Sequence, residues 1–168
     1  MTSDNILETE IQNLISDFLE AARIAAVPIR PEQVAGEVLT APHRRPKRLP
    51  FGKQGIYWFS IANICLKVGK AGALSNARFT SQHYNPKSSG SNLAKSILNS
   101  KKRLKVMLPD DIRRTIDHLT EANVGDWIET HTTRFNIFIG VEFDDFVLSF
   151  LESFIQCRLK PIFEGKGL

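Results

Sequence analysis

Two short apolar segments near the middle of the chain constrain the fold most, because only two residues separate them. Residues 55–61 are rich in aromatic and β-branched side chains, and residues 64–69 follow directly after Ala62-Asn63. Both compositions are typical of β-strands, and so short a connection predicts an antiparallel hairpin. We expect a three-residue loop that ends at Asn63 and sets Tyr57 directly opposite Lys67. A two-residue loop would put these two side chains on opposite faces of the hairpin.

Helical periodicity lies on both sides of this hairpin. Residues 5–26 carry one apolar stripe, and residues 144–160 carry a wide apolar arc that stops before Pro161. A further strand is expected over residues 134–143, and residues 127–133 would extend it or pair with it. Shorter helices are expected over residues 31–38, 72–83, 93–102 and 109–120.

This order of elements predicts an α+β (α/β) protein with a small, mostly antiparallel central sheet of about three strands flanked by helices. At 168 residues the chain is long enough for one well-buried core and short for two. We expect an N-terminal helical extension and basic arm over residues 1–50. The main domain would then span residues 51–168, with a helical insertion at about 85–130.

Acidic residues are absent from Val38 to Pro109, although the chain contains 18 Asp and Glu. The same stretch carries fourteen of the 22 Lys and Arg, so the net charge of +4 combines a +14 block with a remainder of −10. A field of one sign attracts a polyanion and neutralises its phosphates, whereas ordinary solvated surfaces mix both signs. The favoured partner is therefore a polyanion with phosphate groups, such as a nucleic acid. The candidate DNA-binding residues begin in the proline-rich arm at residues 42–48 and continue beyond it: Arg44, Arg45, Lys47, Arg48, Lys53, Lys70, Lys87, Lys101, Lys102 and Arg103.

The composition argues against membrane and secreted classes. No apolar run approaches the length of a membrane span, and the first residues are polar and acidic, unlike a secretory signal. Cys65 and Cys157 lie in apolar stretches without metal or disulfide spacing. We therefore expect a cytoplasmic protein with no membrane partner and two buried free thiols.

The hairpin also carries a motif. Gly55-Ile56-Tyr57, followed ten residues later by Lys67-Val68-Gly69, resembles the paired signature of the GIY-YIG nuclease superfamily. Arg78 follows on an expected helix at the family's spacing, and Glu152 lies in the late helix where the family keeps a metal-binding Glu. The resemblance covers residues 54–164. Its Tyr–Lys pair and small size are most similar to the type II restriction endonucleases of this superfamily.

The resemblance implies metal-dependent hydrolysis of phosphodiester bonds, with a role for each matched residue. Tyr57 would act as general base on the attacking water, and Lys67 would orient that water. Arg78 would hold a phosphate oxygen, and Glu152 would bind one divalent cation, Mg²⁺ or Mn²⁺. His83 would bind phosphate or relay a proton. A free phenol has a pKa of about 10, and we expect the neighbouring lysines and Arg78 to lower it.

Three positions depart from the family pattern. Lys67 replaces the family's second Tyr. Gln82 stands where the family often has His or Tyr, so His83 is the inferred substitute. Glu164, after Pro161, stands at the place of a late Asn.

Two other functions remain open on these residues. A nucleic-acid-binding protein with a decayed active site would explain the lost Tyr and Asn, and a monomeric nicking or repair nuclease would need only one site. A restriction enzyme with one site per chain would cut both strands as a homodimer, to which the helix at 5–26 would offer apolar surface. Each site residue also has a structural reading: Tyr57 as a strand aromatic, Glu152 as the rim of a solvated helix face.

Overall fold

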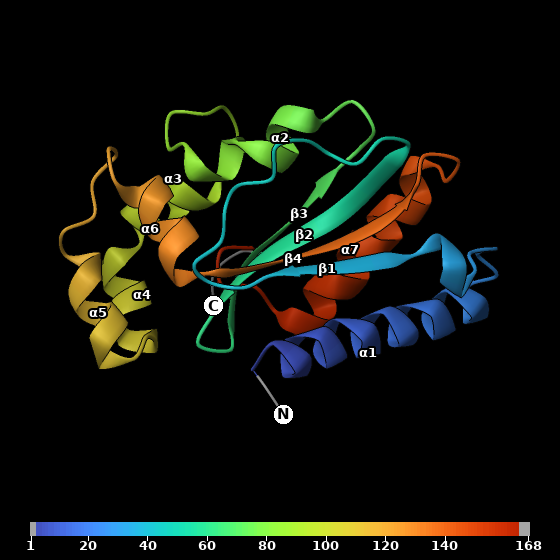
Figure 1. The fold of residues 1–168 in the computed structure, drawn as a ribbon, viewed down its shortest axis with the longest axis horizontal. Helices are drawn as coiled ribbons and strands as arrows, with labels where there is room; N and C mark the ends of the chain where they lie inside the picture. The colour runs from blue at the N-terminus through green and yellow to red at the C-terminus, as the bar shows by residue number, and fades with distance from the viewer. Residues whose placement is uncertain (1–2, 165–168) are drawn as a thin grey trace.

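The computed structural model describes residues 3–164, and within them a four-stranded antiparallel sheet lies between two groups of helices (Figure 1). The spatial order of the strands is β1-β4-β2-β3, so β2 is central and β3 is an edge. The α+β expectation is confirmed, whereas the expectation of about three strands is wrong by one. The strands are β1 (Ala35–Leu39), β2 (Lys53–Ile61), β3 (Ile64–Ala71) and β4 (Thr133–Gly140).

The additional strand is β1, which replaces the helix expected over residues 31–38. Pro31–Gln33 forms a single 3₁₀ turn, and the next residues pair with β4 along the whole of β1. Gly36 permits this arrangement, because a Cβ there would lie 3.0 Å from the Ile15 side chain of the N-terminal helix. The helix signal from Pro31 therefore extends for only one turn before pairing with β4 takes over.

The β2–β3 turn contains two residues, not the expected three. Ala62 and Asn63 both have positive φ, 47° and 64°, as a two-residue hairpin turn requires. Ser60 pairs with Cys65, but the next pair is Phe59 with Lys67, so Leu66 is an extra residue in a β-bulge. The bulge moves the register by one, and Tyr57 and Lys67 share a face although the loop expectation was wrong.

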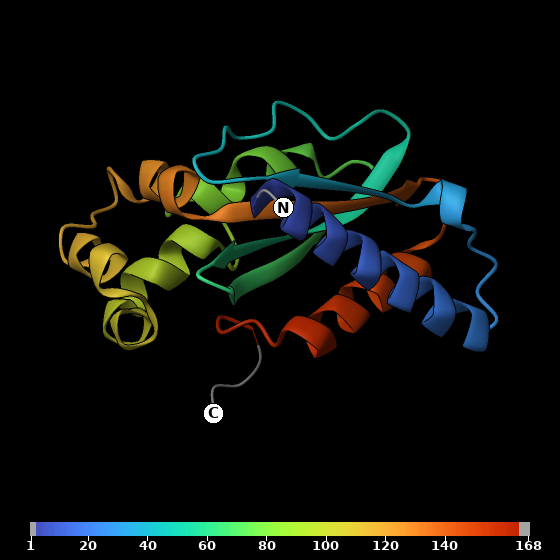
Figure 2. The same cartoon turned by 60° about the horizontal axis from the view of Figure 1, so that its bottom comes forward.

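Helices cover both faces of the sheet. One face packs against α1 (Ser3–Ile24) and α7 (Asp145–Leu159), which Figure 2 shows along the lower side of the sheet. Tyr57 and Phe59 lie on the other face, in a second apolar core shared with the shorter helices. These are α2 (Asn76–Thr80), the 3₁₀ turn η2 (Gln82–Tyr84), α3 (Leu93–Asn99), α4 (Lys101–Met107), α5 (Asp110–Ile116) and α6 (Val124–His131).

The expected helices beyond the hairpin are shorter than the periodicity suggested. The 72–83 helix consists of α2 and η2, and the 93–102 helix is interrupted at Ser100 between α3 and α4. Residues 127–133, expected as strand, mostly belong to α6. This helix buries Val124, Trp127 and Ile128 at helical spacing, so packing of one face decides its conformation.

One surface expectation is also corrected. Most of the apolar stripe of α1, including Ile11, Leu14 and Phe18, is buried against the sheet, whereas Ile6 is 55% exposed. Cys65 is buried as expected, but Cys157 is exposed, because it lies on the outer side of α7. Among residues 3–164 no helix combines the length and apolar character needed to cross a membrane.

Candidate active site

The five site residues expected from the sequence come from five different elements of the fold. The Tyr57 hydroxyl lies 2.6 Å from Nε2 of His83. The charges of Arg78 and Glu152 both act on its pKa, in opposite directions. Lys67 lies on the same face of the hairpin, opposite Phe59, and its charge acts on His83. His83 therefore contacts the phenol directly, whereas Glu152 lies on α7, which packs against the opposite face of the sheet.

Tyr57 is held in a tight aromatic cage and is fully buried. The rings of Phe59 and Phe79 pack edge-on against it, with centroid distances of 6.2 and 6.0 Å. On the opposite strand, a Cβ at Gly69 would lie 2.8 Å from the Tyr57 hydroxyl oxygen. Gly69 is therefore needed to make room for the phenol.

The hydrogen bonds of His83 define its tautomer. Its Nδ1 accepts a hydrogen bond from the backbone N–H of Leu93 at 3.2 Å, so this nitrogen carries no proton. A neutral imidazole must then be protonated at Nε2, which donates to the Tyr57 oxygen. The hydroxyl proton of Tyr57 is consequently free to point towards a substrate.

Burial dominates the ionisation of this pair. It raises the pKa of Tyr57 to about 12, although the charge of Arg78 opposes the rise. The expectation of a lowered phenol pKa is therefore wrong for this state, because desolvation outweighs the cations. Burial, together with the charge of Lys67, lowers the pKa of His83 to about 3. His83 is thus neutral at physiological pH.

Lys67 is almost fully buried, with 3% of its side chain exposed, and its ammonium has two oxygen partners. Ser91 accepts at 3.0 Å and the Glu164 carboxylate at 2.5 Å. The segment after Pro161 brings Glu164 there, because the N–H groups of Ile162 and Phe163 bond to the bulged part of β3. Glu164 is therefore the counter-ion of Lys67.

Arg78 and Glu152 are the accessible members of the cluster. Arg78 is exposed on α2 and forms no ion pair with any residue from 3 to 164. Glu152 has 19% of its side chain exposed and lies 3.5 Å from the Lys70 ammonium, which also donates to Ser149. Within the described part of the chain, no group of three His, Cys, Asp or Glu side chains could enclose a metal ion. A lone carboxylate suits Mg²⁺, which keeps several waters and takes substrate phosphate oxygens as ligands.

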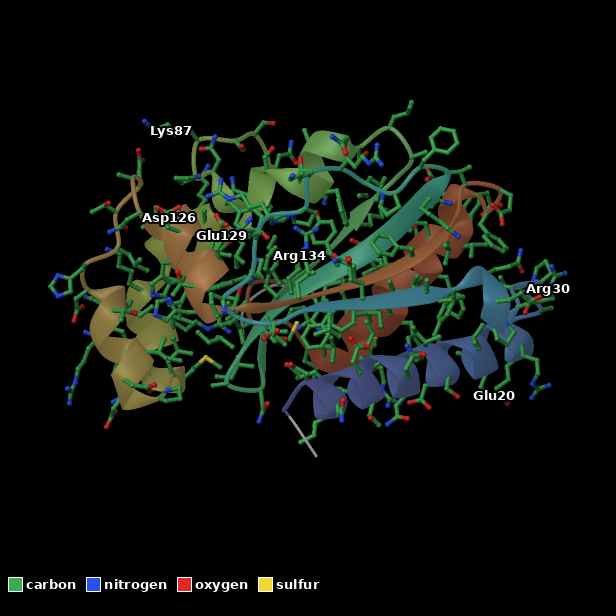
Figure 3. All side chains as sticks on the ribbon, viewed as in Figure 1. Glu20, Arg30, Lys87, Asp126, Glu129 and Arg134 are labelled. Carbon is green, nitrogen blue, oxygen red and sulfur yellow. The ribbon has the colours of Figure 1, made fainter. Side chains whose placement is uncertain are left out.

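The basic residues form a more divided surface than their sequence suggests. Of the fourteen, five are ion-paired within residues 3–164: Arg45, Lys67, Lys70, Lys87 and Lys105. Arg45, expected to bind DNA, instead bonds Glu129 and Asp126 of α6, and Lys87 lies 3.6 Å from Glu121 (Figure 3). Lys101 donates to the Leu119 carbonyl. The remaining DNA-binding candidates have no ion-pair partner among the described residues. Five of them are exposed and Lys53 is partly exposed; the exposed ones are Arg44, Lys47, Arg48, Lys102 and Arg103.

The arm that carries three of these bases is anchored beside the site. His43 is buried, and its ring accepts from the Tyr84 hydroxyl at Nε2 while Nδ1 donates to the Thr132 carbonyl. The backbone N–H of Leu49 donates to Asn76, the first residue of the helix that carries Arg78. The arm therefore passes from η2 to α2, along the cluster around Tyr57.

Arg134 is a buried member of the cluster that sequence reasoning missed. It lies near the middle of the molecule, on β4, with no exposed surface (Figure 3). Its guanidinium stacks 4.9 Å from the Tyr57 ring centroid. In the sequence Arg134 and Asn136 alternate with apolar residues, a pattern typical of a strand with one solvated face. Only knowledge of a functional site on that face would distinguish Arg134 and Asn136 from ordinary solvent-facing residues.

Comparisons with family models, with curated proteins and with solved structures find no match to this chain.

Proposed function

We propose that this protein is a metal-dependent endonuclease that hydrolyses phosphodiester bonds of double-stranded DNA. The observation that carries the proposal is the hydrogen bond between the Tyr57 hydroxyl and His83, with the charges of Arg78 and Glu152 both acting on that phenol. A phenol can act as a base, a guanidinium can hold a phosphate oxygen and a carboxylate can hold a metal ion, which are tasks that such hydrolysis needs. The narrower assignment, also proposed, is a type II restriction endonuclease of the GIY-YIG kind that acts as a homodimer.

Tyr57 would be the general base. Its oxygen accepts from His83, so a phenolate formed there keeps a hydrogen-bond donor and is stabilised by it. Tyr57 has no exposed surface in this state, whereas its neighbour Arg78 is exposed. Movement of Arg78 onto a phosphate oxygen would open the phenol to water. Binding of the substrate and activation of the base would then be one event.

Lys67 would orient the attacking water. An ammonium has three N–H donors, and Ser91 and Glu164 engage two of them. The third is available for water or phosphate at a fixed position, since the side chain is almost fully buried. Arg78 would bind a non-bridging oxygen through its planar fork, which matches phosphate geometry.

Glu152 would hold the metal ion on the leaving-group side. A bound Mg²⁺ or Mn²⁺ supplies Lewis-acid stabilisation of the leaving oxygen. Lys70 lies 3.5 Å from Glu152 and donates to Ser149 on the same helix, which fixes the ammonium beside this carboxylate. Glu152 also raises the pKa of Tyr57, so neutralising its charge favours the phenolate.

The test is incubation of supercoiled plasmid with Mg²⁺. We expect nicked or linear products from the wild type and none from Glu152→Ala. Glu20→Ala removes an exposed carboxylate from α1 and is the matched control, which keeps full activity. Cleavage that survives Glu152→Ala, or no cleavage of any DNA by the wild type, would reject the enzyme.

A DNA-binding protein with a decayed active site is the second candidate. It is favoured by the ion pair of Lys67 with Glu164 and by the burial of Tyr57, since both groups are engaged within the chain. Tight plasmid binding without cleavage supports it. Nicked circles as the end product, together with a monomeric mass, support a nicking or repair nuclease instead of a restriction enzyme.

A further inference from the structure

The most unusual group near the site is the Arg134 guanidinium, a fully buried cation without a carboxylate partner among residues 3–164. Its acceptors are the Asn136 side chain at 3.0 Å, the Tyr84 hydroxyl at 3.2 Å and the Phe79 carbonyl at 2.7 Å. A buried charge is costly unless it is fully hydrogen-bonded or paired. Arg134 offsets this cost with three neutral acceptors and with aromatic rings.

The rings around Arg134 include the expected base. The guanidinium carbon lies 4.5 Å from the Phe79 ring centroid, 4.9 Å from that of Tyr57 and 5.4 Å from that of Phe59. Cation–π attraction at such distances is strongest where water is excluded. The same positive charge lowers the pKa of Tyr57 against the dominant effect of burial.

Three contacts of Arg134 reach elements that each carry a different site residue. The Phe79 carbonyl follows Arg78 on α2, and the Tyr84 hydroxyl follows His83 on η2. The third contact is the Tyr57 ring itself, on β2. One planar, five-donor fork therefore joins three segments that the chain brings together from separate places.

We infer that Arg134 is a positioning residue that holds Tyr57, Arg78 and His83 in their mutual geometry for DNA cleavage, an inference that rests on the proposed function. Lysine cannot replace it, because an ammonium is a point charge without the planar fork. An apolar residue of similar size would avoid the cost of desolvating the charge, and replacement of buried charged groups by apolar ones is often neutral or stabilising. The retained charge thus serves the orientation of the site.

The test compares Arg134→Lys and Arg134→Met with Ile137→Ala, a core truncation on the same strand that faces α7. Single-turnover cleavage with Mg²⁺ is measured per folded molecule, with the folded fraction from circular dichroism. DNA affinity is measured with Ca²⁺ in place of Mg²⁺. We expect cleavage by both Arg134 variants to fall by about a hundredfold, as a misplacement of about 1 Å can cause. Affinity should stay within about threefold, because Arg134 is buried away from DNA, and Ile137→Ala should cleave at nearly the wild-type rate.

A second readout does not depend on activity. The Nε2 proton of His83, donated to Tyr57, should give a slowly exchanging downfield signal in proton NMR spectra. We expect this signal in the wild type and Ile137→Ala, and its loss or displacement in Arg134→Lys. If the wild type cleaves no DNA, the proposed function fails while this signal still tests the inference. An unchanged signal in folded Arg134→Lys, or cleavage equal to the wild type, overturns the positioning role.

A milder variant covers the case in which Arg134 substitutions do not fold. Tyr84→Phe removes a single acceptor of the fork and leaves the ring in place. We expect an intermediate loss of cleavage, about tenfold, and a displaced His83 signal. Wild-type cleavage and an unmoved signal in Tyr84→Phe would overturn the inference in the same way.

Discussion

The pH dependence of cleavage follows directly from the environment of Tyr57. Because burial raises its pKa to about 12, only about one molecule in 10⁵ carries the phenolate at pH 7 and about one in 10³ at pH 9. If the phenolate is the base, the single-turnover rate rises tenfold per pH unit, or about a hundredfold over this range. The sign is fixed, since the active form is the deprotonated one. The assay is cleavage of supercoiled plasmid under single-turnover conditions with saturating Mg²⁺.

Two variants separate Tyr57 from other ionisations, such as that of a metal-bound water. Tyr57→Phe should lose the activity at every pH. Biosynthetic replacement of tyrosine by fluorotyrosine, whose phenol is more acidic, should raise the rate at pH 7 in a Tyr84→Phe background, in which Tyr57 is the sole tyrosine. A flat profile between pH 7 and 9, or a rising profile that survives Tyr57→Phe, would refute the assignment of the base.

Three further predictions concern the rest of the site and its surface. Joint alanine substitution of the exposed arm residues Arg44, Lys47 and Arg48 should weaken DNA binding and reduce the slope of log K against log salt by about 3. Lys87→Ala, which removes a base already paired with Glu121, should change this slope little. Binding titrations from 50 to 200 mM salt decide between these outcomes. Gly69→Ala places a Cβ 2.8 Å from the phenol oxygen of Tyr57 and should slow cleavage about a hundredfold. Gly72→Ala is the control, because a Cβ there has its nearest contact at 4.0 Å and should not slow cleavage. Equal cleavage rates for the two variants would contradict the tight packing around Tyr57. The folded pKa of His83 lies below its unfolded value of about 6.5, so on acidification the unfolded chain binds the proton first. The free energy of unfolding should therefore decrease by about 2 kcal/mol as the pH is lowered from 6.5 to 4.5. Urea titrations should show a smaller decrease in His83→Gln, and an identical decrease would refute this prediction.

The candidate site residues were reached from the sequence by two routes. Lys67 was conspicuous as a charge inside an apolar strand, and it is indeed buried, with Glu164 as its counter-ion. Tyr57, Arg78 and Glu152 could be placed only through a spacing known from a family, since each is ordinary in its own helix or strand. Arg134 had neither signal: an arginine at an alternating strand position is most simply a solvated residue. Its burial depends on α2 and η2 closing over that face, which local periodicity does not specify.

The hairpin illustrates a limit of a more general kind. Loop length and bulge position both change register by one residue, so their effects on which face a side chain occupies cancel in pairs. The two-residue turn at Ala62-Asn63 would separate Tyr57 from Lys67, and the bulge at Leu66 brings them back to one face. The residues of the turn alone could therefore not predict which face Tyr57 and Lys67 occupy relative to each other. If both side chains serve one site, they must lie on the same face of the hairpin. Several combinations of turn length and bulge place them on the same face, so this requirement does not select one of them. Deletion of Leu66 would remove the bulge and still leave Lys67 opposite Phe59, so Lys67 should keep the face of Tyr57 while the turn remains intact.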